Sequence, residues 1–173
     1  NDEVLNHVLE FTGDGIANLS IDERLTIANM TTEWGALAGV FPIDEVTILW
    51  LRDRADFIGK RGLEGVLSDT DGENGIHPRL NHDRINDLEN NSLIADNGAY
   101  YTKNIKLNLK SVSPHISGPN HVKAMTSLHD AVRKNIKIDK AYLGSCVNSR
   151  VQDLAEAANT IKGQQVASHV ECY

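Results

Sequence analysis

The chain of 173 residues has few aromatic residues, few cysteines and no excess of positive charge. Aromatic residues make up 5% of the sequence, so leucine, isoleucine, valine and alanine must supply most of the core. Cys146 and Cys172 are the two cysteines, too few for a disulfide framework, and they indicate reduced thiols. With 24 acidic residues against 17 lysines and arginines, the net charge of −7 gives no electrostatic basis for binding nucleic acid.

Long apolar segments are missing too. No apolar run approaches the roughly 20 residues that cross a bilayer, so we expect no membrane partner. The first residues, Asn-Asp-Glu-Val, resemble neither a secretory signal nor an arginine-rich transit peptide, and there is no initiator methionine. We interpret both ends as cuts within a longer protein.

The first third of the chain predicts a strand followed by two helices. Residues 7–11 alternate loosely between apolar and polar, which is typical of a short strand. Ser20 and Glu23 have the spacing of a capping box, which predicts a helix from residue 20 to residue 38. Asp44 can cap a second helix over residues 45–54.

The middle of the chain predicts a long insertion and then a strand. Residues 59–91 are rich in Gly, Asp, Asn and Glu, which indicates a surface loop with a short helix near its end. Apolar Ile105, Leu107 and Leu109 alternate with polar residues, the pattern of a half-buried strand.

The last third predicts a strand–helix–strand unit, with strands at 140–143 and 166–170 and a helix at 149–158. The fold class is therefore α/β. We expect a first α/β domain over residues 1–115, a linker over 116–135 and the start of a second, parallel α/β domain over 136–173.

Cys146 is the most informative candidate for chemistry. It follows a predicted strand and precedes a helix, which is where open α/β sheets place ligands. The amino end of a helix also favours a thiolate, the form of cysteine that attacks or binds metal. A lone cysteine is more often structural, so the local sequence leaves both interpretations open.

Asn29 and Glu33 are four residues apart on the first predicted helix, which places both side chains on one face. Their neighbours are mostly apolar, and buried polar groups need partners. A functional pair and a solvated polar stripe both fit this pattern. The seven histidines show no metal-ligand spacing.

Three segments together resemble the aconitase superfamily, which includes aconitases, isopropylmalate isomerases and homoaconitases. Residues 27–36 read IANMTTEWGA and resemble the family's NM-x-x-E-x-GA helix. Residues 142–150 read YLGSCVNSR and resemble its GSCTNSR cluster segment, and residues 114–120 look like the proline-rich stretch before it. The residues between them are most similar to the fungal homoaconitase branch.

The resemblance implies an aconitase-like three-layer α/β/α domain and a hydro-lyase with a [4Fe–4S] cluster held by three cysteines. Cys146 matches the first of these, and Asn148 lies in the same cofactor-binding segment. Asn29 matches a residue beside the cluster, and Glu33 an acid that bonds water or hydroxyl at the labile iron. The reaction would interconvert homocitrate, homoaconitate and homoisocitrate, small tricarboxylic acids of lysine biosynthesis, in the mitochondrial matrix.

The departures from the family pattern matter as well. The other two cluster cysteines of the family form a CxxC downstream, and Cys172 does not have that spacing. We expect these 173 residues alone to be inactive and free of the cluster. We also expect them to self-associate through apolar surfaces that the missing domains would cover in the longer protein. The alternatives are an isopropylmalate dehydratase or aconitase of the same superfamily, and a non-catalytic α/β binding domain.

Overall fold

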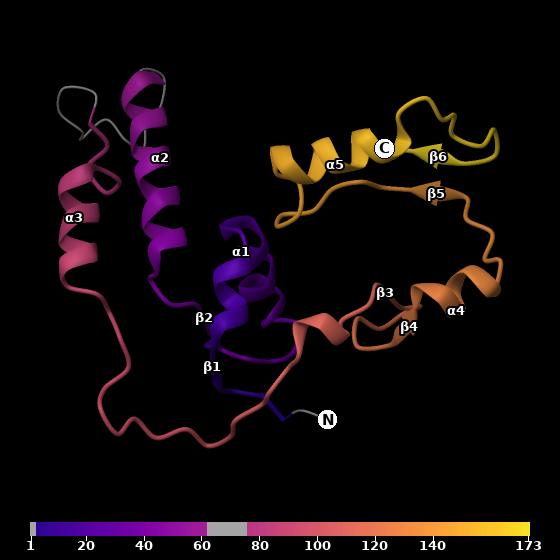
Figure 1. Ribbon diagram of the computed structural model, residues 1–173. Coiled ribbons are helices and arrows are strands. Elements are labelled where there is room, and N and C mark those ends of the chain that lie inside the picture. The colour runs from indigo at the N-terminus through magenta and orange to yellow at the C-terminus, as the bar shows by residue number, and fades with distance from the viewer. Residues whose placement is uncertain (1–2, 62–75) are drawn as a thin grey trace. The chain divides into compact units, whose positions relative to one another are not determined.

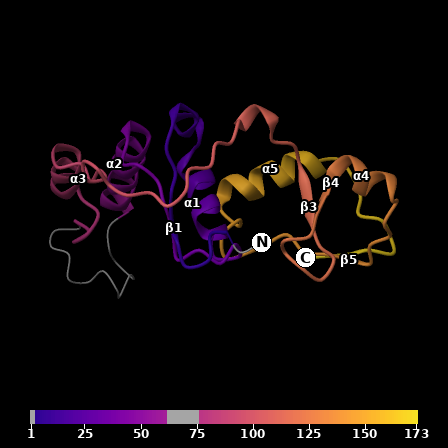
Figure 2. The same cartoon turned by 90° about the horizontal axis from the view of Figure 1, so that it is seen from below.

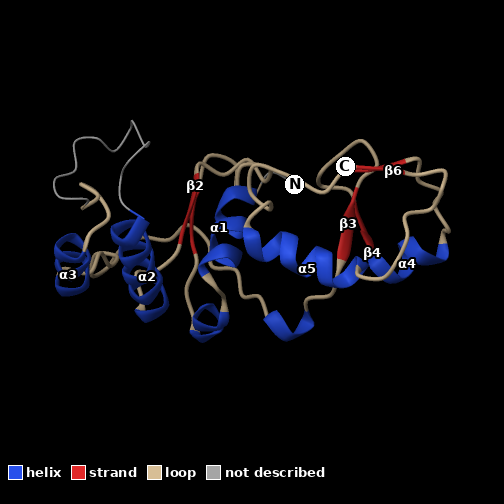
Figure 3. Cartoon of the chain, turned by 90° about the horizontal axis from the view of Figure 1, so that it is seen from above, coloured by secondary structure: helices blue, strands red, loops and turns tan. Residues whose placement is uncertain are grey.

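The computed structural model describes residues 3–61 and 76–173 as a mixture of helices and strands, which confirms the α/β class. Within these residues the strands pair into three separate two-stranded sheets, β1 with β2, β3 with β4 and β5 with β6 (Figure 3). By their internal contacts the residues form two compact units, which are described one at a time. Unit 1 consists of Asn1–Leu9, Leu25–Gly39 and Lys106–Tyr173, and unit 2 of Glu10–Arg24 and Val40–Ile105.

Short elements precede and follow the first α-helix. Strand β1 (Val8–Glu10) forms where the sequence predicts a strand, and it pairs with β2 (Ala38–Val40). A short 3-10 helix, η1 (Asp14–Asn18), follows β1. The sequence does not predict β2, because its three residues are too few for an alternation to be recognised.

Helix α1 (Ile21–Met30) begins with the predicted capping box. The Ser20 backbone N–H donates to Glu23 Oε2 at 2.7 Å, and the Glu23 N–H donates to Ser20 Oγ at 3.3 Å. The predicted continuation of the helix to residue 38 is wrong. Each backbone N–H of residues 31–35 bonds a carbonyl three residues earlier, and Gly35, with φ of 84°, turns the chain away from the helix.

A buried arginine organises unit 2. Arg24 is 3% exposed, and its guanidinium donates to both carboxyl oxygens of Asp44, at 2.7 and 2.8 Å. The same side chain donates to the carbonyls of Ile16 and Leu19 at 2.9 and 3.1 Å. A buried charge is tolerated only when it is paired and hydrogen-bonded, and these contacts meet that requirement. Arg24 therefore links η1 and the first turn of α1 to Asp44, the residue that precedes the next helix.

The apolar core of unit 2 lies between helices α2 (Glu45–Arg61) and α3 (His82–Asn90), which run side by side in Figure 1. Asp44 caps α2 as predicted, because its Oδ1 accepts from the Thr47 backbone N–H at 3.1 Å. Buried side chains from the two helices form the core: Ile48, Ala55 and Ile85.

The predicted insertion at 59–91 is partly helical. Helix α2 extends to Arg61, seven residues beyond the predicted end, and Ala55 in the added part belongs to the core shared with α3. The predicted short helix near the end of the insertion corresponds to α3. Residues 62–75 lie outside the described residues.

The strand predicted at residues 105–109 is wrong. Among the described residues no strand forms there, and Ile105 and Leu107 are 66% and 68% exposed. The alternation satisfies the pattern of a half-buried strand, but no neighbouring strand takes up the backbone hydrogen bonds that a ladder needs. A 3-10 helix, η3 (Leu109–Ser111), follows.

The residues predicted as a linker, 116–135, contain regular structure in unit 1. Strands β3 (His115–Ser117) and β4 (Met125–Ser127) pair antiparallel and lead into helix α4 (Leu128–Arg133) (Figure 2). Ser127 caps this helix by accepting from the Asp130 backbone N–H at 3.1 Å. The division into domains at 115 and 136 stays a prediction.

The predicted strand–helix–strand unit is present at the end of the chain. Strand β5 (Lys140–Ala141) leads through a loop into helix α5 (Val151–Ile161), and β6 (Glu171–Cys172) pairs parallel to β5. The strand predicted at 166–170 is wrong, because residues 167–170 form a turn, closed by the bond from the Val170 N–H to the Ala167 carbonyl at 2.9 Å, and the second strand follows that turn. Within residues 3–61 and 76–173, none of the helices combines the length and apolar character that a bilayer crossing requires.

The ion pair in unit 2 predicts a pH-dependent stability. The hydrogen bonds from Arg24 lower the pKa of Asp44 from 3.8 to about 2. Because the folded pKa lies below the unfolded one, the ionised carboxyl stabilises the fold above pH 3.8, and that contribution is lost as the pH falls towards about 2. We expect a loss of roughly 1–2 kcal/mol over this range, allowing for solvent screening of a partly exposed carboxyl.

Urea unfolding followed by circular dichroism at a series of pH values measures this loss. The Asp44→Asn variant is the control, because its side chain cannot titrate, and its unfolding free energy is expected to fall less over the same range. Parallel pH profiles for the two proteins would contradict the assignment.

Candidate functional site

The loop between β5 and α5 holds Cys146 in a defined conformation. Ser145 Oγ accepts from the backbone N–H groups of Val147 and Asn148, at 3.1 and 2.6 Å. Ser149 Oγ accepts from the Ser145 N–H at 2.7 Å. These bonds satisfy amides that would otherwise be free just before a helix. The two serines therefore fold the loop around the cysteine.

The same bonds leave the Cys146 side chain exposed. Val147, the next residue, is 8% exposed and anchors the loop by burial. An ideal Cβ at Gly144 would lie 3.0 Å from the ring of Tyr142, so a glycine lets the backbone pass close to this ring. The prediction that Cys146 follows a strand and precedes a helix is confirmed.

Asn29 and Glu33 do not share one helix face, and that prediction is wrong. Asn29 lies exposed in the last turn of α1, whereas Glu33 lies in the turns that follow the helix. The helix stops between them because residues 31–35 adopt tighter turns. The angular relation of a continuous helix therefore does not apply to this pair.

Glu33 nevertheless has an unusual environment. Its Oε2 atom is shielded from solvent, and among the described residues it has no hydrogen-bond partner. A buried polar atom without a partner costs free energy, and such atoms are rare in folded proteins. This oxygen is therefore available to accept a hydrogen bond from a bound water or hydroxyl.

Asn148 connects the cysteine loop to α1. Its side-chain Nδ2 donates to Thr26 Oγ1 at 3.2 Å. Thr26 lies one helical turn before Asn29, and all these residues belong to unit 1. The structure therefore brings the loop that carries Cys146 to the helix that carries Asn29. Thr26 lies in none of the sequence motifs, although its spacing of three residues from Asn29 is a signal that points to the same helix face.

The side chains near Cys146 fit only part of what a cluster or a metal ion needs. Within residues 3–61 and 76–173, no three His, Cys, Asp or Glu side chains come together. A four-iron cluster is held by three or four thiolates, and this loop supplies one. The exposed thiol of Cys146 and the unpartnered oxygen of Glu33 fit individual positions beside such a group, but not the complete set of ligands.

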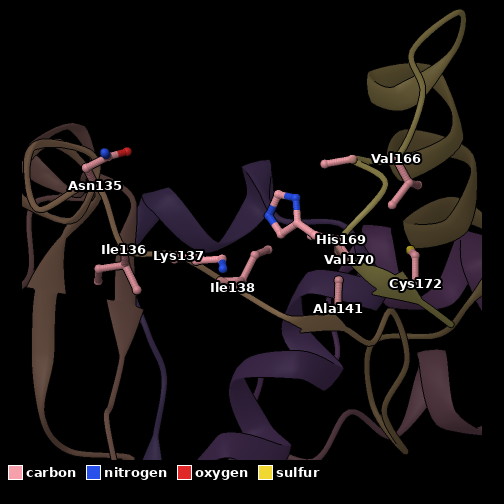
Figure 4. Close-up of a pocket in the computed structure, with 10 residues that line it drawn as sticks. Asn135, Ile136, Lys137, Ile138, Ala141, Val166, His169, Val170 and Cys172 are labelled. Atoms are coloured by element: carbon pink, nitrogen blue, oxygen red, sulfur yellow. The ribbon is translucent and has the colours of Figure 1, made fainter.

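A cavity of about 660 Å³ lies elsewhere in unit 1, next to β5 and β6 (Figure 4). Its walls are mostly aliphatic, and Cys172 and His169 contribute the thiol and the imidazole. None of the four predicted site residues lines this cavity. Cys172 is therefore separate from the candidate site in its surroundings as well as in its sequence spacing.

Comparisons with known proteins agree with the motifs. The model of the aconitase family (aconitate hydratase) matches residues 1–173. The chain is 50% identical over 173 residues to a protein named "Homoaconitase, mitochondrial" from Debaryomyces hansenii, covering all of this chain and 23% of the relative. Proteins of the same name from Mycosarcoma maydis and Candida albicans are 50% and 49% identical, covering 99% and 100% of this chain. The chain spans 23% of the length of each of these relatives.

The exposure of both thiols predicts their reactivity. Because Cys146 and Cys172 are free and exposed, we expect both to react with an aromatic disulfide reagent in the native protein. The absorbance of the released thiolate measures the number of reactive thiols per chain. The Cys146→Ser and Cys172→Ser variants should each lose one equivalent. A thiol that reacts only after denaturation would contradict the exposure described for it.

Proposed function

The chain belongs to the aconitase family, and on this premise we propose that it is part of a homoaconitate hydratase. This enzyme would interconvert homocitrate, homoaconitate and homoisocitrate by dehydration and rehydration, in lysine biosynthesis. The identity of about 50% to mitochondrial homoaconitases over the whole chain carries this proposal. The names of these relatives also support a mitochondrial location, which we propose to be the matrix.

Cys146 is proposed as one ligand of a [4Fe–4S] cluster. When bound, the cluster would supply a Lewis acid that polarises a substrate oxygen. The thiol is exposed in the loop that precedes α5, and this exposure supports the role. Asn148 is proposed to belong to the same cofactor-binding loop and to keep it in place.

Glu33 is proposed to accept a hydrogen bond and then a proton from the water that hydration adds, and to return the proton to the hydroxyl that dehydration removes. Its Oε2 atom, shielded and without a partner among the described residues, supports this role. Asn29 is proposed to orient the cofactor or the substrate through its amide. Its exposure at the end of α1 leaves both ends of that amide available to a ligand.

The remaining ligands and the substrate-binding groups would come from other parts of an enzyme as long as the homoaconitases that this chain matches. One thiolate cannot hold a four-iron cluster with ordinary affinity, so a polypeptide of these 173 residues alone is expected to be inactive. Its partners would be the other domains of the same enzyme. Many apolar side chains of unit 1 are exposed, Val151 at 86% and Val132 at 69% among them, which supports self-association of the isolated chain.

A chimaeric enzyme tests the proposed function. The matching segment of the Debaryomyces hansenii homoaconitase is replaced by this chain, and hydration of homoaconitate by the purified, cluster-reconstituted chimaera is followed by ultraviolet absorbance. We expect activity close to that of the intact relative. Cys146→Ser should reduce it to background, and Glu33→Gln should lower kcat by about 100-fold, a typical contribution of a general acid or base. Cys172→Ser is the matched control and should leave the rate unchanged.

Other outcomes separate the alternatives. Hydration of isopropylmaleate or cis-aconitate without hydration of homoaconitate would assign the chain to another branch of the family. A folded chimaera that binds the cluster and hydrates none of the three substrates would favour a non-catalytic domain.

A further inference from the structure

The Cys146 loop is fastened to α1 by a side-chain hydrogen bond across a long stretch of sequence. Asn148 and Thr26 are 122 residues apart in the chain, and the Nδ2–Oγ1 distance is 3.2 Å. Both residues belong to unit 1, so the contact lies within one compact body. Such a contact holds a loop only if the loop is itself rigid.

The loop meets that condition. Ser145 Oγ binds the backbone amides of Val147 and Asn148, and the side chain of Val147 is buried. Asn148 is therefore fixed to Ser145 through its backbone and to Thr26 through its side chain. Cys146 lies between these two anchored residues.

The position of Thr26 on α1 determines which part of the helix the Cys146 loop lies next to. Thr26 and Asn29 are three residues apart on α1, so their side chains lie on neighbouring positions of one face. The hydroxyl of Thr26 therefore holds the loop next to the face that carries Asn29. A methyl group at the same position could not accept the amide hydrogen of Asn148.

We propose that Thr26 is a positioning residue. It acts through Asn148 to hold the Cys146 loop against the end of α1. This inference rests on the proposed function in that the loop and the helix end are taken to be two walls of one active site. Thr26 itself does not touch the reacting atoms.

The experiment uses the 173-residue chain without cofactor or substrate. In Thr26→Val, the side-chain amide protons of Asn148 should shift in the NMR spectrum towards the values of solvent-exposed asparagines. Exchange of the backbone amides of Val147 and Asn148 should become about fivefold faster, as expected for the loss of one hydrogen bond. Thr26→Ser keeps the hydroxyl and should restore both properties.

The control variant is Thr160→Val. Thr160 Oγ1 donates to the Glu156 carbonyl on the exposed part of α5 at 2.9 Å, so its loss removes a threonine hydroxyl without touching the loop. It should leave the Asn148 signals unchanged. Unchanged exchange of the backbone amides in the paired strands β3 and β4, which also belong to unit 1, shows that each variant is folded.

Three outcomes would overturn the proposal. The first is unprotected Val147 and Asn148 amides in the wild-type chain, and the second is an Asn148 signal unaffected by Thr26→Val. The third is a Thr26→Ser variant that behaves like Thr26→Val. None of these readouts depends on activity, so failure here leaves the hydro-lyase proposal standing. An inactive chimaera, together with protected loop amides, would contradict the proposed function and still support the Thr26–Asn148 contact.

Discussion

The buried guanidinium of Arg24 is the interaction on which the amino-terminal part of this chain depends. It closes a bidentate ion pair with Asp44 and binds two backbone carbonyls, so the start of α1 and the start of α2 are defined by one side chain. Removal of one partner would leave a buried charge uncompensated, and in proteins this typically costs about 3–5 kcal/mol.

The candidate site depends on the other end of the same helix. α1 stops early, which places Glu33 in a turn with one carboxyl oxygen shielded and unpartnered among the described residues. The Cys146 loop reaches α1 through the bond between Asn148 and Thr26. A helix end and a loop before a helix thus supply polar groups that regular secondary structure leaves unsatisfied, and such groups are the ones available to ligands.

Local chemistry made several features predictable. The capping box at Ser20 and the cap at Asp44 follow from side chains that satisfy nearby backbone groups, and both are present. The strand predicted around Leu107 failed because a strand needs a partner that an alternating pattern does not supply. The motifs containing Asn29, Glu33, Cys146 and Asn148 identified the family, which the comparisons confirm.

The sequence by itself determined the family, the α/β class and the residue types that carry the expected chemistry, because these depend on side chains and their spacing along the chain. The tertiary structure decided that Arg24 is buried against Asp44, that Glu33 leaves the helix and that Asn148 reaches Thr26. The Arg24–Asp44 and Asn148–Thr26 contacts join residues distant in sequence, and their free energies depend on which groups lose water together when the chain folds. No local pattern contains that information.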